Sequence, residues 1–72
     1  MPRSFDNTFM KKIALKLIEI RKGYNLTQEN VYNDTGIHIA RIESAKRDTS
    51  INSLKRICDY YDIDLSDFFK EI

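Results

Sequence analysis

Arg41 carries the side chain best suited to reading a nucleic-acid base. Its guanidinium could donate two hydrogen bonds to O6 and N7 of guanine in the major groove, a contact worth about 1 to 3 kcal/mol of discrimination. His38, three residues earlier, could touch a base edge or a phosphate. Ile37 and Ala40 could contact thymine methyl groups. The alternatives are a solvated arginine, a histidine without a role, and apolar side chains that pack against the preceding helix.

These residues lie in a segment that predicts two short helices joined by a tight turn. Thr27 is a good N-cap, so a helix should begin after it, and Val31 and Tyr32 supply its apolar side. Thr35 offers a second N-cap. A helix that begins after Thr35 carries Ile39 and Ile42 on one face, and its opposite face carries Ile37, Ala40, Arg41 and Ser44. This arrangement is typical of a DNA-reading helix-turn-helix.

The whole segment, "LTQENVYNDTGIHIARIE", resembles the phage Cro and repressor type of helix-turn-helix, also called Xre-like. The resemblance rests on the "TQE" opening and the "IARIE" ending in this order. It extends to Arg21 and to the tail "TSINSLKRICDYYDIDLSDFF", where the family has its fourth and fifth helices. It implies an all-α, compact five-helix lambda-repressor-like domain whose second and third helices form the helix-turn-helix. Its implied partner is double-stranded DNA.

The resemblance also implies roles for individual residues. Gln28 matches the position that grips a phosphate, and Lys46 and Arg47 match clamps on the DNA backbone. Glu43 matches a structural residue that pairs with an arginine of the first helix, here Arg21. Together with the residues already described, the expected DNA-binding set is Thr27, Gln28, Thr35, Gly36, Ile37, His38, Ala40, Arg41, Ser44, Lys46 and Arg47. A solvated charge pair is the alternative for Lys46 and Arg47.

One departure from the family concerns length. Members usually have about three more residues between the "TQE" opening and the Ile-Glu ending. The shortening falls either in the second helix, with Thr35 as N-cap of an intact third helix, or after Gly36, with His38 as a poor cap of a truncated one. Because Thr caps helices better than His, we favour a second helix over residues 28–33 and a third over residues 36–44.

The remaining helices follow from caps and apolar spacing. The first should span residues 8–22 and end at Gly23, the fourth should begin after Ser50, and Asp64 should cap the fifth, with Asp67 completing a weak capping box. The apolar stripe of the first helix is Phe9, Ile13, Leu17 and Ile20, and that of the fourth is Ile51, Leu54, Ile57, Cys58 and Tyr61.

Ala45 is a local conflict. Similar proteins commonly have Gly just after the third helix, where the chain turns through a left-handed conformation that disfavours a Cβ. Either Ala45 is strained by about 1 kcal/mol or this loop turns differently.

Length and composition limit the possibilities. A chain of 72 residues is one domain, 1–72, in which we expect residues 1–6 to form a flexible arm. We find no apolar segment that could cross a membrane or act as a signal peptide, so we expect a cytoplasmic location. Cys58 is the only cysteine and is expected to be a buried structural thiol.

Charge is distributed unevenly although the net charge is only +1. Residues 1–25 hold six basic and two acidic side chains, a balance of +4; residues 26–48 have a balance of −1 and residues 49–72 of −2. A basic first helix and an acidic C-terminal end suit a domain that turns one end toward phosphates. Ordinary solvated faces would explain the same distribution.

Enzyme functions find little support. One His, one Cys and scattered carboxylates supply no nucleophile-base pair and no metal-ligand spacing, and no glycine-rich phosphate loop is present. We therefore expect no catalysis, no cofactor, no metal and no small-molecule ligand.

The sequence favours a transcriptional repressor that binds a two-half-site operator as a homodimer. The expected dimer interface is the apolar stripe of the last helix, Leu65, Phe68, Phe69 and Ile72, although all four could instead close the monomer core. The alternative function is a protein-interaction or antitoxin-like module on the same scaffold, which Ile37 and Ala40 on the outward face would suit.

Overall fold

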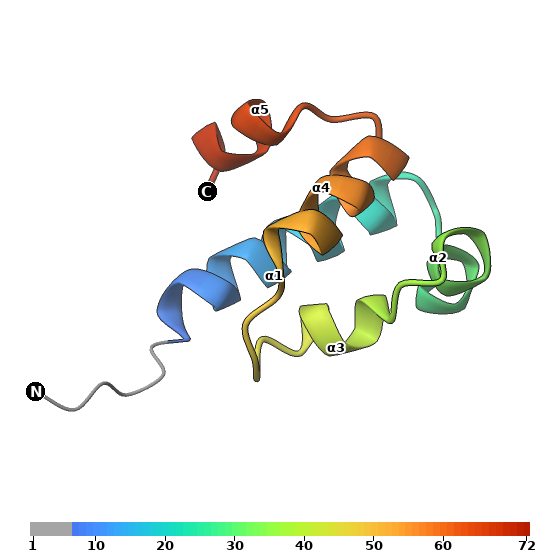
Figure 1. The fold of residues 1–72 in the computed structure, drawn as a ribbon. Coiled ribbons are helices and arrows are strands. Elements are labelled where there is room, and N and C mark those ends of the chain that lie inside the picture. Colours follow the sequence, from blue (N-terminus) through green and yellow to red (C-terminus); the bar gives the residue numbers. More distant parts are fainter. Residues whose placement is uncertain (1–6) are drawn as a thin grey trace, which may run out of the picture.

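The computed structural model describes residues 7–72, which form five α-helices joined by short turns (Figure 1). In chain order they are α1 (Thr8–Gly23), α2 (Gln28–Thr35), α3 (Ile39–Glu43), α4 (Ile51–Tyr60) and α5 (Leu65–Lys70). The described residues contain no strand, and the predicted all-α class with five helices is confirmed. The predicted N-terminal arm lies outside the described residues.

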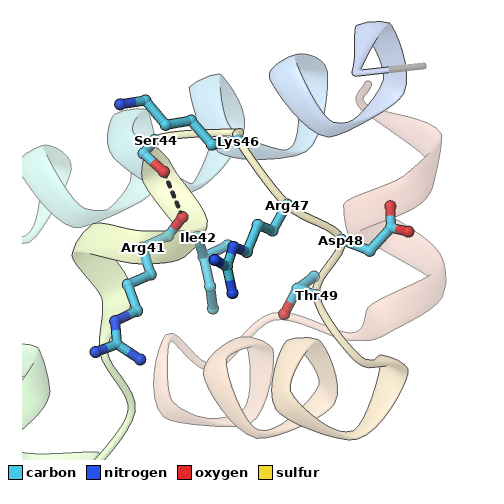
Figure 2. Close-up of a pocket in the computed structure, with 7 residues that line it drawn as sticks. All are labelled: Arg41, Ile42, Ser44, Lys46, Arg47, Asp48 and Thr49. Atoms are coloured by element: carbon cyan, nitrogen blue, oxygen red, sulfur yellow. Dashed lines mark hydrogen bonds between the residues drawn. The ribbon is translucent and has the colours of Figure 1, made fainter. Parts of the chain in front are cut away.

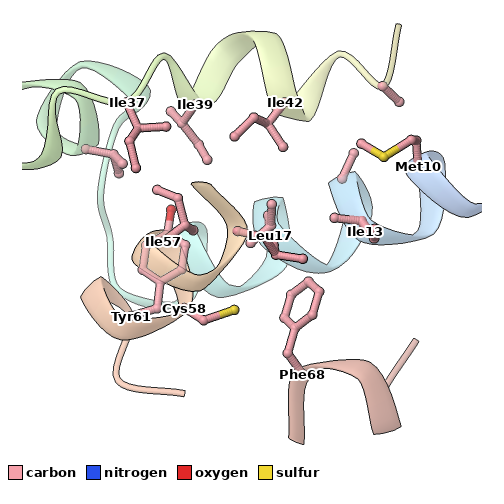
Figure 3. Close-up of a cluster of buried hydrophobic side chains, with 14 residues drawn as sticks. Met10, Ile13, Leu17, Ile37, Ile39, Ile42, Ile57, Cys58, Tyr61 and Phe68 are labelled. Carbon is pink, nitrogen blue, oxygen red and sulfur yellow. The ribbon is translucent and has the colours of Figure 1, made fainter. Parts of the chain in front are cut away.

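The core forms around α1 and α4, with α3 on one side and α5 on the other (Figures 1 and 3). Leu17 of α1 and Ile57 of α4 are fully excluded from solvent. Ile39 and Ile42 reach this core from α3, as their spacing predicted, and Phe68 reaches it from α5. Apolar packing therefore holds the short α3 against the long α1.

Two members of the predicted apolar stripes lie outside the core. Phe9 is 53% exposed and Ile51 is 65% exposed. Both belong to the first turn of their helix, at the edge of the core. There, a residue with the correct helical spacing can still lack another helix to pack against. Cys58 is fully buried, as predicted, and its burial raises the pKa of the thiol above its ordinary value. The thiol therefore stays protonated and unreactive at neutral pH.

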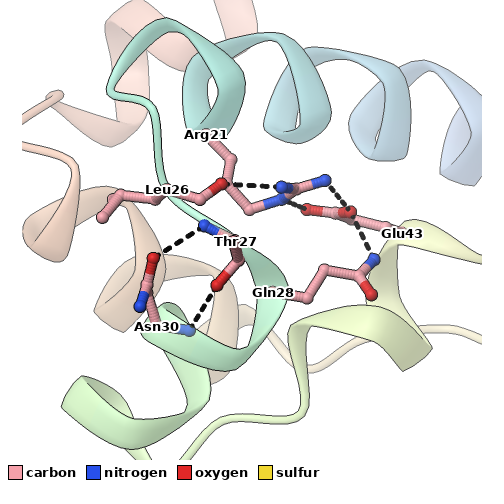
Figure 4. A network of polar contacts seen from close by, with 6 residues as sticks. All are labelled: Arg21, Leu26, Thr27, Gln28, Asn30 and Glu43. Carbon is pink, nitrogen blue, oxygen red and sulfur yellow. Dashed lines mark hydrogen bonds and ion pairs between the residues drawn. The ribbon is translucent and has the colours of Figure 1, made fainter.

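Helix α2 begins at its predicted cap but ends later than predicted. Thr27 Oγ1 accepts the Asn30 N–H at 3.0 Å, and Asn30 Oδ1 accepts the Thr27 N–H at 2.9 Å, which completes a capping box (Figure 4). The helix continues through Thr35 and ends at Gly36, whose φ of 75° is left-handed. The Gly36 N–H donates to the Tyr32 carbonyl at 2.7 Å, an ordinary glycine end to a helix.

The prediction that Thr35 caps the third helix was therefore wrong. Its hydroxyl donates to the Val31 carbonyl at 2.7 Å, one turn back within α2, and accepts the Ile37 N–H at 3.0 Å. The predicted helix over residues 36–44 is reduced to Ile39–Glu43. His38 is its N-cap and makes no side-chain cap bond. The shortening thus falls in the third helix, which was the less favoured alternative.

The caps of the last two helices differ. Ser50 caps α4 as predicted, since its hydroxyl accepts the Ser53 N–H at 3.0 Å. Asp64 occupies the N-cap position of α5 but makes no side-chain cap bond. Its carboxylate instead accepts the Ser66 hydroxyl at 3.1 Å, so the predicted capping box is absent. The Asp64 carbonyl still accepts the Phe68 N–H at 2.9 Å, the first bond of this short helix.

Ala45 adopts the left-handed conformation, with φ at 58°, and so the first of the two alternatives is confirmed. Its N–H donates to the Ile42 carbonyl at 3.1 Å and its side chain is buried. The methyl group therefore compensates part of the backbone strain by packing in the core.

The first prediction compares two buried alanines. Ala45→Gly should change the free energy of unfolding by less than about 0.5 kcal/mol, because relief of about 1 kcal/mol of strain offsets the lost methyl packing and the chain entropy of glycine. Ala14→Gly, in the middle of α1, should lower it by about 1.5 kcal/mol or more. Urea unfolding measures both changes, and equal losses would show that Ala45 is unstrained.

Candidate nucleic-acid interface

A buried ion pair links α3 to α1. Arg21 Nε donates to Glu43 Oε2 at 2.8 Å and Arg21 Nη2 donates to Glu43 Oε1 at 3.0 Å, so the ion pair is bidentate (Figure 4). The third guanidinium nitrogen, Nη1, donates to the Leu26 carbonyl at 2.8 Å. The Arg21 and Glu43 side chains are only 11% and 3% exposed. The pairing that the family resemblance implied is confirmed.

This pair also reaches the start of α2. Gln28 Nε2 donates to Glu43 Oε1 at 2.8 Å, so one carboxylate joins the first residue of α2, the last residue of α3 and the arginine of α1. The hydrogen bonds that Arg21 donates to Glu43 raise the pKa of its guanidinium in spite of the opposing effect of burial. The Gln28 amide, expected to grip a phosphate, is thus already engaged in positioning α3, although its side chain remains exposed.

The exposed side of α3 presents a small set of side chains. His38, Ala40, Arg41 and Ser44 are all exposed. The Ser44 hydroxyl donates to the Arg41 carbonyl at 2.7 Å, which caps the end of the helix (Figure 2). The Arg41 guanidinium has no hydrogen-bond partner within residues 7–72. Arg41 is therefore a free donor group on a fixed helix.

The structure corrects the expectation for Ile37. This residue is only 8% exposed and packs in the core beside Ile39 (Figure 3). A third helix starting at Gly36 would have turned Ile37 outward, but here it precedes the helix and its side chain points inward. Ile37 cannot contact a base without leaving the core.

The loop after α3 borders a hollow of about 550 Å³. Its lining residues come from the end of α3 and from the loop, namely Arg41, Ile42, Ser44, Lys46, Arg47, Asp48 and Thr49. Figure 2 shows the Arg47 side chain turned toward Ile42, while Lys46 extends in another direction from the loop. Three basic side chains around one hollow, against a single carboxylate, give this region a surface suited to an anion.

Three other predicted contacts surround the helix-turn-helix. Thr27 is exposed, but its hydroxyl is used in the capping box. Thr35 is half-buried and its hydroxyl is used within α2. Gly36 is exposed at the end of α2. These residues shape the turn. The N–H groups of Thr27 and Gly36 are already engaged, with Asn30 Oδ1 and the Tyr32 carbonyl.

Two exposed residues near the turn were not predicted as part of the site. Tyr32 is 44% exposed, and its ring centroid lies 4.6 Å from that of His38. Arg56 of α4 donates through Nη2 to the Thr35 carbonyl at 2.8 Å, at the C-terminal end of α2. The sequence held no decisive signal for Tyr32, because adjacent helical residues about 100° apart can both be buried, as Ile57 and Cys58 of α4 are.

The family of this chain follows from a comparison with models of protein families. Residues 16–72 match the Cro/C1-type HTH DNA-binding domain. The chain belongs to this family. As a Cro/C1-type domain it is a DNA-binding transcription regulator whose partner is double-stranded DNA. No curated protein and no solved structure matches the chain.

Two further findings concern other classes of function. Among residues 7–72, no group of three or more His, Cys, Asp and Glu side chains could hold a metal ion. Within the same range, each helix is too short or too polar to cross a lipid bilayer.

The second prediction concerns the buried pair. Glu43→Gln should lower the free energy of unfolding by about 3 kcal/mol, because it leaves the Arg21 charge buried without its counter-charge. The control is Asp59→Asn, which removes an exposed ion pair with Lys55 on α4 and should leave stability nearly unchanged. Denaturant unfolding of both variants tests the difference, and similar small losses would mean that the buried pair contributes little.

Proposed function

We propose that this Cro/C1-type domain is a repressor that places α3 in the major groove, with Arg41 as the base-reading side chain. The observation that carries the proposal is the free Arg41 guanidinium on the outward side of a helix fixed by the Arg21–Glu43 pair. A planar donor fork on a fixed helix matches the O6 and N7 acceptors of guanine. A fixed helix also limits the entropy lost on binding.

Phosphate contacts are assigned to the basic loop and to the turn. Lys46 and Arg47 are exposed in the loop after α3, two and three residues beyond its C-cap, where the phosphate backbone beside the major groove would pass. In Figure 1, α3 and α5 lie on opposite sides of the molecule. The acidic side chains Asp62, Asp64, Asp67 and Glu71 gather around α5, so phosphates are repelled from the side opposite to α3.

A helix of five residues reads few base pairs, and a homodimer on two half-sites supplies the missing specificity. The expected dimer stripe needs revision, because Phe68 is fully buried in the monomer core. Leu65, Phe69 and Ile72 remain partly exposed, and Phe69 stacks on Phe9 with ring centroids 6.2 Å apart. The proposed interface is therefore the edge that α5 shares with the start of α1.

The alternative of a protein-interaction module, which the net charge of only +1 and two apolar side chains expected on the outward face kept open, loses part of its support. It relied on Ile37 and Ala40 as apolar side chains on the outward face. Ile37 is buried, so only the single methyl group of Ala40 remains there. The basic hollow beside α3 suits a polyanion better than an apolar protein partner.

The third prediction tests base reading. Arg41→Ala should weaken binding to a selected duplex by about 1 to 3 kcal/mol and relax the preference at one position of each half-site. Lys46→Ala should weaken binding to all duplexes alike and reduce the salt dependence of binding. Fluorescence anisotropy with selected and random duplexes measures both. If Arg41→Ala weakens both duplexes equally, Arg41 does not read a base.

The fourth prediction tests the dimer. Phe9→Asp should give a folded monomer with weak affinity for a two-half-site duplex, because it places a charge in the proposed interface. Ile51→Asp is the matched control, since Ile51 is also an exposed apolar residue in the first turn of a helix but lies on α4, and the change should leave the dimer intact. Sedimentation with and without duplex reports the outcome. A wild-type protein that remains monomeric on the duplex contradicts the dimer.

A further inference from the structure

The chain makes an unusual turn immediately before α3. The Ile39 N–H donates to the Ile37 carbonyl at 2.8 Å, a bond that spans only two residues. His38, between them, has φ −77° and ψ 78°, the conformation of an inverse γ-turn. The residues on either side, Ile37 and Ile39, are both buried, so the turn leaves His38 as the exposed residue between two anchors.

The exposed imidazole is held by an aromatic neighbour. The Tyr32 ring of α2 lies with its centroid 4.6 Å from that of His38 and is tilted by 31°. Such a contact restricts the rotamers of a side chain that would otherwise move freely in water. The ring of His38 therefore has a preferred orientation before any partner binds, which reduces the entropy lost on binding.

His38 also lies on the same side of α3 as Arg41. The two are three residues apart, and the Arg41 N–H donates to the His38 carbonyl at 3.0 Å, so the exposed N-cap residue lies next to Arg41 at the start of α3. Three residues of helix rise about 4.5 Å, close to the ~3.4 Å between neighbouring base pairs. Two groups with this separation can address adjacent or nearly adjacent pairs.

We propose that His38 is a second base-reading residue, which contacts the major-groove edge of a purine next to the base pair read by Arg41, and that Tyr32 positions its ring. The inference rests on the proposed function of α3 in the major groove. A neutral imidazole has one N–H donor and one acceptor nitrogen. The donor matches N7 or O6 of a purine, which are acceptors in the major groove. Tyr32 acts through His38, so its ring is required and its hydroxyl is not.

This pair lengthens a reading surface that α3 alone leaves short. Five helical residues extend only about 7.5 Å, roughly two base-pair steps. The γ-turn continues the surface by one residue beyond the helix, and the stacked Tyr32 ring gives that residue a fixed support from α2. The γ-turn and the contact between Tyr32 and His38 thus restore part of the base-reading length that the shortened third helix lacks.

The test is a selection of bound duplexes from a random pool with the 72-residue protein and five variants. His38→Ala should lose about tenfold preference at one position of each half-site, which differs from the position lost in Arg41→Ala. Tyr32→Leu should lose preference at the same position as His38→Ala, and Tyr32→Phe, the matched control that keeps the ring, should retain it. A double variant of Tyr32→Leu and His38→Ala should lose no more than His38→Ala alone.

The outcomes separate this inference from the proposed function. If the wild type selects no sequence and binds weakly and independently of salt, DNA reading by α3 fails as a whole. If the wild type selects a sequence and His38→Ala keeps the preference at every position, the inference about His38 is wrong while DNA reading stands. If Tyr32→Phe loses preference as Tyr32→Leu does, the hydroxyl acts directly and Tyr32 is not a positioning residue. The melting temperature of each variant is measured alongside the selection. Because His38 is exposed, His38→Ala should stay folded, and it tests the base contact even if Tyr32→Leu has a lowered melting temperature.

Discussion

The buried ion pair between Arg21 and Glu43 is the interaction on which the rest of this molecule depends. A helix of five residues has too few hydrogen bonds to offset the cost of its own nucleation, so α3 needs tertiary support. Ile39 and Ile42 supply apolar support on one side. Glu43 fixes the other end of α3 to α1, and through Gln28 to the start of α2. The Arg21–Glu43 pair thus fixes the orientation of α3 relative to α1, which apolar packing alone would restrict less.

The shortened third helix explains most of the local features around it. Gly36 ends α2 in a left-handed conformation, and a γ-turn at His38 then leads directly into α3. This path draws Ile37 into the core and leaves His38, Ala40, Arg41 and Ser44 as the exposed residues. The reading surface is therefore narrow. The neighbouring loop with Lys46 and Arg47 compensates by adding charge close to the same surface.

Much of the fold could be predicted because its signals are local. Thr27 and Ser50 cap their helices, Gly23 ends α1, and Leu17 and Ile57 fall in apolar stripes that are buried. The cap preference failed at Thr35, because a threonine hydroxyl bonds equally well to the carbonyl one turn back. The residues between Thr35 and Ile39 do not decide whether the Thr35 hydroxyl caps the third helix or donates to the Val31 carbonyl. Packing of the rest of the core decides it.

The site was predictable in part for the same reason. Exposure of Arg41, Lys46 and Arg47 follows from their type and spacing, and the Arg21–Glu43 pair followed from the family resemblance. The inward turn of Ile37 and the contact between Tyr32 and His38 depend on where α3 begins. Phe68 was assigned to an interface because helical spacing cannot tell which of four apolar side chains reaches the core.

The most direct test of this account is amide hydrogen exchange of the wild-type protein, measured by NMR. The decisive amides are those of Ser44 and Ala45, which donate to the carbonyls of Ala40 and Ile42 at 3.1 Å. If the ion pair makes α3 part of the same cooperative unit as α1, their opening free energies should lie within about 1 kcal/mol of those in the middle of α1. Opening free energies lower by several kcal/mol would contradict the account, because α3 would then open while the rest of the core stays folded.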